Sequence, residues 1–118
     1  MGIGYMLVNF TRKEVVKYTH LPTSKARELA GSPVSAAITT WYLLEHPGEQ
    51  IAFVSDSEDD WPFPLGSRKD VADYQEMTNA VVQQLITEGI LRDDGVAWAD
   101  EEEPKSVHVR ALKNVWMQ

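Results

Sequence analysis

The sequence predicts an α+β fold: one domain over residues 1–118, with a mixed or antiparallel sheet of about five to six strands and helices packed mainly on one face. Three observations predict it. Segments rich in β-branched and aromatic residues gather near both ends of the chain, segments with helical spacing fill the middle, and no repeat or composition shift divides the sequence. Strands grouped apart from helices are typical of this class, and the length suits one domain. The expected order is ββ-αα-β-α-βββ.

Two strands are expected at the start of the chain. Residues 5–10 (YMLVNF) and 15–21 (VVKYTHL) are rich in β-branched and aromatic side chains, and the four polar residues TRKE separate them. Two such runs with a short polar connection are typical of a β-hairpin.

Two helices are expected next. The first follows a cap at Thr23 or Ser24 and ends at Gly31, because glycine favours helix termination. The second begins with Ser32 as N-cap and Pro33 at the first helical position, where the missing N–H costs nothing. Apolar residues at helical spacing then predict one buried stripe. The stripe comprises Val34, Ala37, Ile38, Trp41 and Leu44.

A third strand and a third helix follow. Residues 50–55 (QIAFVS) form a nearly continuous apolar run, which is typical of a strand buried on both faces and hence central in the sheet. Ser67 and Asp70 have capping-box spacing. Helix is therefore expected from Arg68 to about Glu88, in one or two pieces, with Gly89 just past its end.

The last third of the chain predicts a hairpin and a final strand. In residues 90–99 (ILRDDGVAWA), apolar pairs flank Asp94-Gly95, the dipeptide that two-residue hairpin turns favour. Residues 106–112 (SVHVRAL) alternate, which places Val107 and Val109 on one face of a strand.

Charge and cysteine content restrict the partners and the compartment. The net charge is −7, and it is uneven: residues 1–50 carry five basic and four acidic side chains, whereas residues 51–118 carry six and fourteen. Such asymmetry argues against nucleic acid or an anionic membrane and favours a basic partner, although solubility alone also explains it. The chain has no cysteine, no secretory-signal pattern and no bilayer-length apolar run, so we expect a cytoplasmic protein.

The sequence gives no pattern for catalysis. It has no nucleophile elbow, no phosphate-binding glycine loop and no zinc-binding helix motif. His20, His46 and His108 have no partner at a recognisable spacing, so structural or surface roles are expected for them. We therefore predict no catalytic residue and no cofactor, while an enzyme whose site forms only in three dimensions stays an alternative.

The acidic segment partly resembles a calcium site. Asp56, Glu58 and Asp60 alternate like the start of a calcium-binding loop. The pattern then breaks, because Trp61 stands where that loop needs glycine and Ser67 where it needs a bidentate glutamate. No metal site is predicted.

The strongest candidate site is the stretch SDSEDDWPFP, residues 55–64. Its carboxylates must stay hydrated, since burying them unpaired is prohibitive, and its two prolines stiffen the backbone. The aromatic side chains either fold inward over the sheet or stand exposed as anchors for a partner. The predicted partner-binding residues are Asp56, Glu58, Asp59, Asp60, Trp61 and Phe63. A secondary acidic patch, which a solvated connection also explains, comprises Asp100, Glu101, Glu102 and Glu103.

These features favour a small acidic, non-enzymatic interaction protein that binds a basic protein partner, for example an inhibitor or immunity protein against a toxin or nuclease. One alternative is a winged-helix-like regulatory or adaptor domain that acts through protein contacts, since a predicted helix leads into a β-ribbon. The segment from Asp70 through Leu91 contains no Lys or Arg. DNA binding by that face is therefore not expected.

Overall fold

The computed structural model describes residues 4–18, 21, 26–55, 61–103 and 108–116, and it confirms the α+β class. The elements follow in the order β1 (Tyr5–Asn9), β2 (Glu14–Lys17), α1 (Ala26–Gly31), α2 (Pro33–Glu45), β3 (Ile51–Ser55), the 3₁₀ helix η1 (Arg68–Asp73), β4 (Gln75–Glu76), α3 (Thr78–Thr87), β5 (Leu91–Ala99) and β6 (His108–Asn114).

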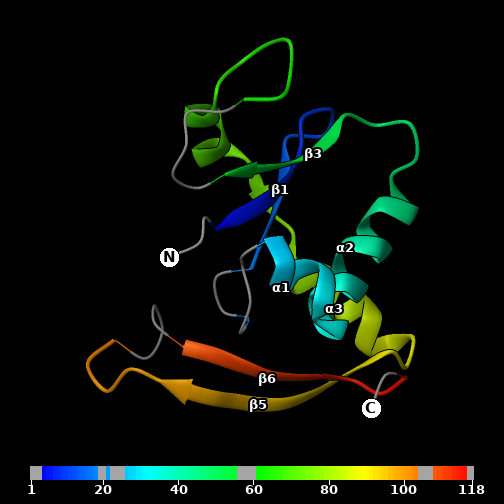
Figure 1. Cartoon of the computed structure of the whole chain (residues 1–118), viewed down its shortest axis with the longest axis vertical. Helices are drawn as coiled ribbons and strands as arrows, with labels where there is room; N and C mark the ends of the chain where they lie inside the picture. The colour runs from blue at the N-terminus through cyan, green and yellow to red at the C-terminus, as the bar shows by residue number, and fades with distance from the viewer. Residues whose placement is uncertain (1–3, 19–20, 22–25, 56–60, 104–107, 117–118) are drawn as a thin grey trace.

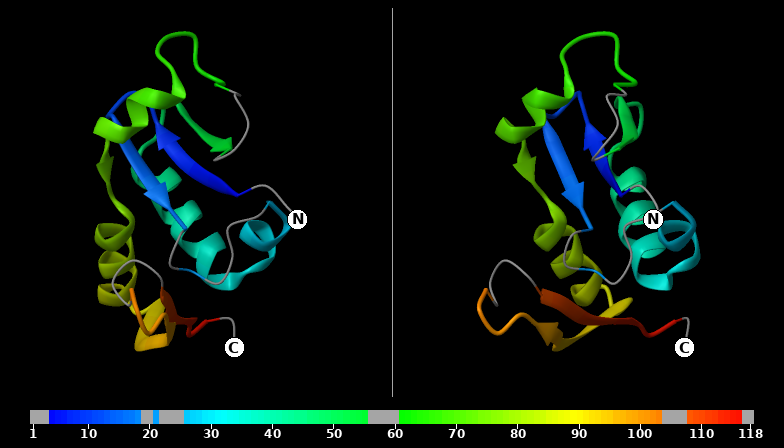
Figure 2. Two further views of the ribbon diagram at one scale, coloured as in Figure 1. Left: turned by 90° about the vertical axis from the view of Figure 1, so that its left-hand side faces the viewer. Right: turned by 60° about the vertical axis from the view of Figure 1, so that its left-hand side comes forward.

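The strands form two sheets, where the sequence analysis expected one. The larger sheet has the order β3-β1-β2-β4; β1 is antiparallel to β2 and β3, and β2 is parallel to β4. The smaller sheet is the antiparallel pair β5–β6, which we call the ribbon. The ribbon lies at one end of the molecule, while residues 61–73 lie at the other (Figures 1 and 2).

The prediction that the strand at 50–55 is central was wrong, because β3 lies at the edge of the sheet. Its apolar run has another cause. Ile51 packs against the cluster on the helix-facing side of the sheet, whereas Val54 belongs to the cluster on the opposite side. An edge strand whose two faces are both covered thus has the same sequence pattern as a central strand.

The core has two parts, one on each face of the larger sheet. Adjacent residues of a strand point to opposite faces, so Leu7 and Val16 face the helices while Val8 and Val15 face away. The helices cover the first face, as expected (Figure 1). The second face is covered by residues from the segment 61–74, among them Val71 and Tyr74.

Helix α2 begins as predicted, but its buried stripe differs. The Ser32 side chain accepts a hydrogen bond from the Ser35 backbone N–H, and Pro33 occupies the first turn. Leu44, which was expected in the stripe, is 70% exposed. The last turn instead buries Tyr42, because this side chain meets polar groups of the β1–β2 hairpin.

The region predicted as helix from 68 to 88 is interrupted. Helix η1 and helix α3 are separated by β4, whose residues Gln75 and Glu76 pair with β2. The Ser67 backbone N–H donates to the Asp70 carboxylate over 2.9 Å, in agreement with the predicted cap. Gly89 follows α3 with φ +76°, a conformation that favours glycine.

The predicted hairpin turn at Asp94-Gly95 was also wrong, since β5 runs through both residues. The pairing with β6 shifts between Asp93 and Val96 and again between Val96 and Trp98. Gly95 has φ +97°, and its N–H donates to the Asp93 carboxylate over 2.8 Å. The dipeptide therefore forms an irregularity of the bulge type inside a strand, a role that also needs the conformational freedom of glycine.

Candidate functional site

The described part of the predicted partner-binding segment packs against the sheet. Trp61 and Phe63 are half-buried and contact the cluster that contains Val8 and Val54. The Trp61 indole N–H donates to the Leu65 carbonyl over 2.7 Å. These contacts agree with the inward-facing interpretation. The acidic residues 56–60 lie outside the described residues, so their binding role stays a prediction.

A cluster of rings holds this segment in place. The Phe10 and Phe63 rings stack with centroids 5.3 Å apart, and Trp61 meets Phe63 edge-on at 5.0 Å. The Lys13 ammonium lies 3.4 Å from the centroid of Phe10. Such ring and cation–π contacts each add about 0.5–1.5 kcal/mol to simple burial. The two aromatics therefore contribute to the core, and only their remaining exposed area is free to meet a partner.

Two exposed apolar side chains lie on β5 of the ribbon, which leads into the secondary acidic patch. Val96 is 58% and Trp98 is 55% exposed on β5. Asp100 follows β5 closely, and its carboxylate accepts hydrogen bonds from the backbone N–H groups of Glu102 and Glu103, at 2.8 and 3.1 Å. These bonds form a turn in which Glu101, Glu102 and Glu103 are exposed. An aromatic beside a carboxylate cluster, predicted at 56–63, is thus observed at 96–103.

The ribbon's charges differ between its two ends. Near the base, Arg92 binds Asp94 over 2.9 Å and Arg110 binds Asp93 over 3.2 Å. The pKa of Asp93 is lowered, chiefly by the hydrogen bond from the Gly95 backbone N–H, and that of Asp94 by the hydrogen bond from Arg92. At the other end, no Lys or Arg among the described residues pairs with the carboxylates of residues 100–103.

The exposure of Trp98 was not predicted from the sequence, which placed this residue only in a strand of the hairpin expected over residues 90–99. One signal was available. Only Ala99 separates Trp98 from four consecutive acidic residues, which must be hydrated. A strand that leads directly into such a run extends toward solvent, and so do its last side chains.

A buried polar network, also missed, connects the β1–β2 hairpin to α2. The fully buried Asn9 amide donates to the Tyr42 hydroxyl at 3.0 Å and to Glu49 at 2.9 Å. The Tyr42 hydroxyl in turn donates to Glu14 at 2.8 Å. Arg12 binds Glu49 through Nε at 2.7 Å. Hydrogen bonds from Asn9 and Arg12 lower the pKa of Glu49, and burial raises that of Tyr42.

His46 lies at the end of this network, next to a cavity of about 220 Å³. Its ring stacks on Tyr42 at 4.1 Å, and Nδ1 donates to the Tyr42 carbonyl over 2.7 Å. Its other nitrogen, Nε2, is 3.7 Å from the Glu14 carboxylate. That separation exceeds the roughly 2.6–3.2 Å expected of an acid–base pair. The network's groups mainly satisfy one another, which favours a structural role.

We expect the change Tyr42→Phe to lower the free energy of unfolding by about 1–3 kcal/mol, because Asn9 and Glu14 would each lose a buried hydrogen-bond partner. Urea unfolding followed by circular dichroism measures this loss. Tyr5→Phe makes the same chemical change at a half-buried tyrosine, where we expect less than about 0.5 kcal/mol. Equal losses in the two variants would contradict the structural role of the network.

Comparison with known proteins found no matching family model, no matching curated protein and no matching solved structure. Within the described ranges, no group of three or more His, Asp or Glu side chains is arranged to hold a metal ion. No helix in that part of the chain is long and apolar enough to cross a membrane. The geometry of the described residues is therefore the basis for a functional proposal.

Proposed function

We propose that this chain is a non-enzymatic interaction protein that binds a basic protein partner, and that the far end of the ribbon is part of its binding surface. The observation that carries the proposal is the exposure of Val96 and Trp98 on the strand that leads directly into the acidic residues 100–103. We call these two side chains and residues 100–103 the ribbon-end surface.

Two physical arguments support a protein partner. Tryptophan is enriched among the residues that dominate binding energy at interfaces, and Trp98 is held on a strand paired with Val109 of β6. A side chain on a paired strand loses less conformational freedom on docking than one on an open loop. The adjoining carboxylates would attract a cationic surface and accelerate its association.

The uneven charge of the chain supports the same class of partner. Its second half carries fourteen acidic against six basic residues, and three of those basic residues, Arg92, Arg110 and Lys113, pair with acids at the base of the ribbon. A concrete form of the proposal is an inhibitor or immunity protein whose acidic surface blocks a toxin or nuclease built to hold phosphate. The segment 56–63 is proposed as a separate contact surface for a basic partner, since its described residues 61–63 lie at the end of the molecule opposite the ribbon (Figure 1).

The proposal is tested by affinity capture from the source cells followed by titration calorimetry with the captured partner. We expect Trp98→Ala to weaken binding about 30-fold, the effect of losing roughly 2 kcal/mol at an interface hot spot. The charge reversal Glu101→Lys with Glu102→Lys should slow association, most strongly at low salt. Asp59→Ala with Asp60→Ala tests the separate contact surface in the same assay.

Matched controls separate binding from folding. Leu44→Ala removes from α2 an apolar side chain that is more exposed than Trp98, and Glu76→Lys reverses an exposed charge on β4. Neither is expected to alter capture, and circular dichroism checks that every variant is folded. If Trp98→Ala and the double charge reversal both capture the same partners with unchanged affinity, the ribbon-end surface has no part in binding.

A further inference from the structure

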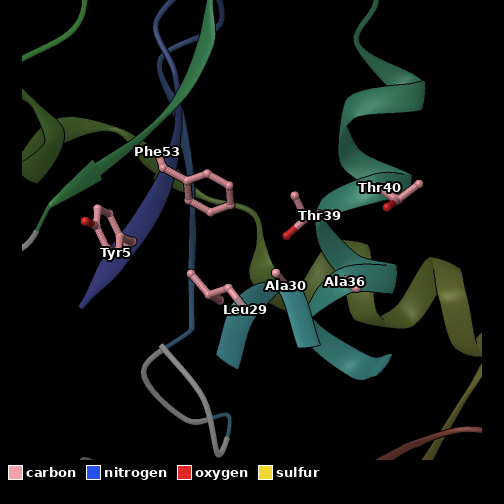
Figure 3. Close-up of a pocket in the computed structure, with 7 residues that line it drawn as sticks. All are labelled: Tyr5, Leu29, Ala30, Ala36, Thr39, Thr40 and Phe53. Atoms are coloured by element: carbon pink, nitrogen blue, oxygen red, sulfur yellow. The ribbon is translucent and has the colours of Figure 1, made fainter. Parts of the chain in front are cut away.

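A cavity of about 330 Å³ lies between the larger sheet and the helix pair α1–α2, away from the ribbon-end surface. Figure 3 shows Tyr5 of β1 and Phe53 of β3 on its sheet side and α2 residues on the facing side. The described residues that line it are Tyr5, Leu29, Ala30, Ala36, Thr39, Thr40 and Phe53.

The cavity exists because small side chains face large ones. On α2 the lining residues are Ala36, Thr39 and Thr40, which are too short to reach the Phe53 ring on the opposite wall (Figure 3). Phe53 consequently stays 41% exposed although it points toward the helices. An exposed apolar ring at the wall of a concave site is typical of a ligand pocket.

The lining selects against charged ligands. None of the described residues around the cavity carries a charge, and most of the lining is carbon. A charged group placed there would lose hydration without gaining an ionic partner from these described residues, which is strongly unfavourable. Three hydroxyls belong to the lining, those of Tyr5, Thr39 and Thr40. The Tyr5 hydroxyl points away from α2 (Figure 3), and the Thr39 hydroxyl lies 2.6 Å from that of Tyr18 but keeps the capacity for a further hydrogen bond. The lining can therefore satisfy a single neutral donor or acceptor.

The lining also favours an aromatic ligand. Phe53 already meets Tyr5 edge-on at 6.4 Å and Tyr18 at 6.3 Å, so three rings gather at this wall. Rings are favourable neighbours at centroid separations of about 4.5–7 Å, and the exposed part of Phe53 can accept a further one. An apolar cavity of about 150 Å³ is known to hold benzene, so this volume accommodates a larger, substituted or fused ring.

We propose that this pocket, which the described residues named above line, binds a small uncharged aromatic molecule that carries a neutral polar substituent. The proposal is independent of the ribbon-end surface, which lies on a different element. It assigns a ligand-binding site to a part of the chain for which no functional site was predicted from the sequence.

The test uses indole and phenol as probes and follows the protein's amide signals by nuclear magnetic resonance. We expect both probes to shift the signals of Thr39, Thr40 and Phe53, and to bind at least about tenfold more tightly than benzoate or benzylammonium, which are charged rings. Shifts confined to other parts of the chain, or equal affinity for the charged rings, would overturn the proposal.

Two variants test whether indole binds in this pocket. Ala36→Phe fills the cavity and is expected to weaken indole binding about tenfold or more, whereas Ala72→Phe places the same side chain at an exposed position of η1 and leaves it unchanged. Phe53→Leu keeps an apolar wall but removes the ring, and it should weaken indole more than cyclohexanol. If indole binds both Ala36→Phe and Phe53→Leu as tightly as the unmodified protein, its site is not this pocket.

Discussion

Ile38→Ala is expected to lower the free energy of unfolding by about 2–5 kcal/mol, the loss typical of emptying a well-packed site. Ile38 has no exposed surface and lies in α2, where it packs in the cluster with Leu7, Val16 and Leu85. The change leaves a cavity between the sheet and the helices. Urea denaturation at neutral pH measures the loss of unfolding free energy, provided that the slope of the transition is the same in the variant and the unmodified protein.

The matched control is on the same helix. Leu44→Ala also removes a branched apolar side chain from α2, but Leu44 is largely exposed, so we expect a change within about 0.5 kcal/mol. If the two variants lost equal stability, the assignment of Ile38 to the interior face of α2 would be wrong.

Stability is expected to fall at alkaline pH because two phenols are buried. Burial raises the pKa of Tyr18 to about 12 from its ordinary 10.0, and it also raises that of Tyr42. The folded state therefore holds these protons more tightly than the unfolded state does. The contribution of the two phenols to the free energy of unfolding is complete below about pH 10 and is lost as the pH rises toward about 12. Tyr18 alone accounts for a loss of about 3 kcal/mol.

Denaturant unfolding at a series of alkaline pH values measures this loss. Tyr18→Phe should show a flatter dependence, because phenylalanine has no proton to release. The Tyr18 hydroxyl is 2.6 Å from the Thr39 hydroxyl, so the variant also loses a hydrogen bond and starts from a lower stability at neutral pH. An unchanged slope between pH 10 and about 12 in this variant would contradict the assigned cause.

Short-range signals predicted the elements that depend on neighbouring residues. The β1–β2 hairpin and the start of α2 at Ser32 and Pro33 are both as expected. Caps and polar connections act within about four residues, so the sequence contains their full cause. The same holds for Ser67 and Asp70, whose spacing correctly placed the start of η1.

The errors concern elements whose surroundings come from distant parts of the chain. The position of β3 in its sheet depends on which strands pair with β1. Whether Asp94-Gly95 forms a turn or part of a strand depends on a partner strand that begins at His108. A turn-forming dipeptide becomes part of a strand when long-range pairing supplies more hydrogen bonds than a local hairpin would.

The buried polar network could not be predicted from the sequence for the same reason. Tyr42 lies in α2 and His46, four residues later, caps its C-terminal end, a spacing at which side chains can meet. Asn9 and Glu14, which contact them, come from the β1–β2 hairpin, and Glu49, which binds Asn9, comes from the loop before β3. Only packing of α2 on the sheet brings these groups together, so the sequence alone showed them as unrelated polar residues.

Because the larger sheet is covered on both faces, its strands carry adjacent apolar residues, such as Val15 and Val16, instead of an alternation. Hydrophobicity alone therefore does little to distinguish the native alignment from one displaced by a single residue. Asn9 makes that distinction. A slip of β1 by one position would turn its amide away from Tyr42 and toward Val54, where the described surroundings are apolar. One buried amide thus penalises the misaligned sheet and keeps the chain in a single arrangement.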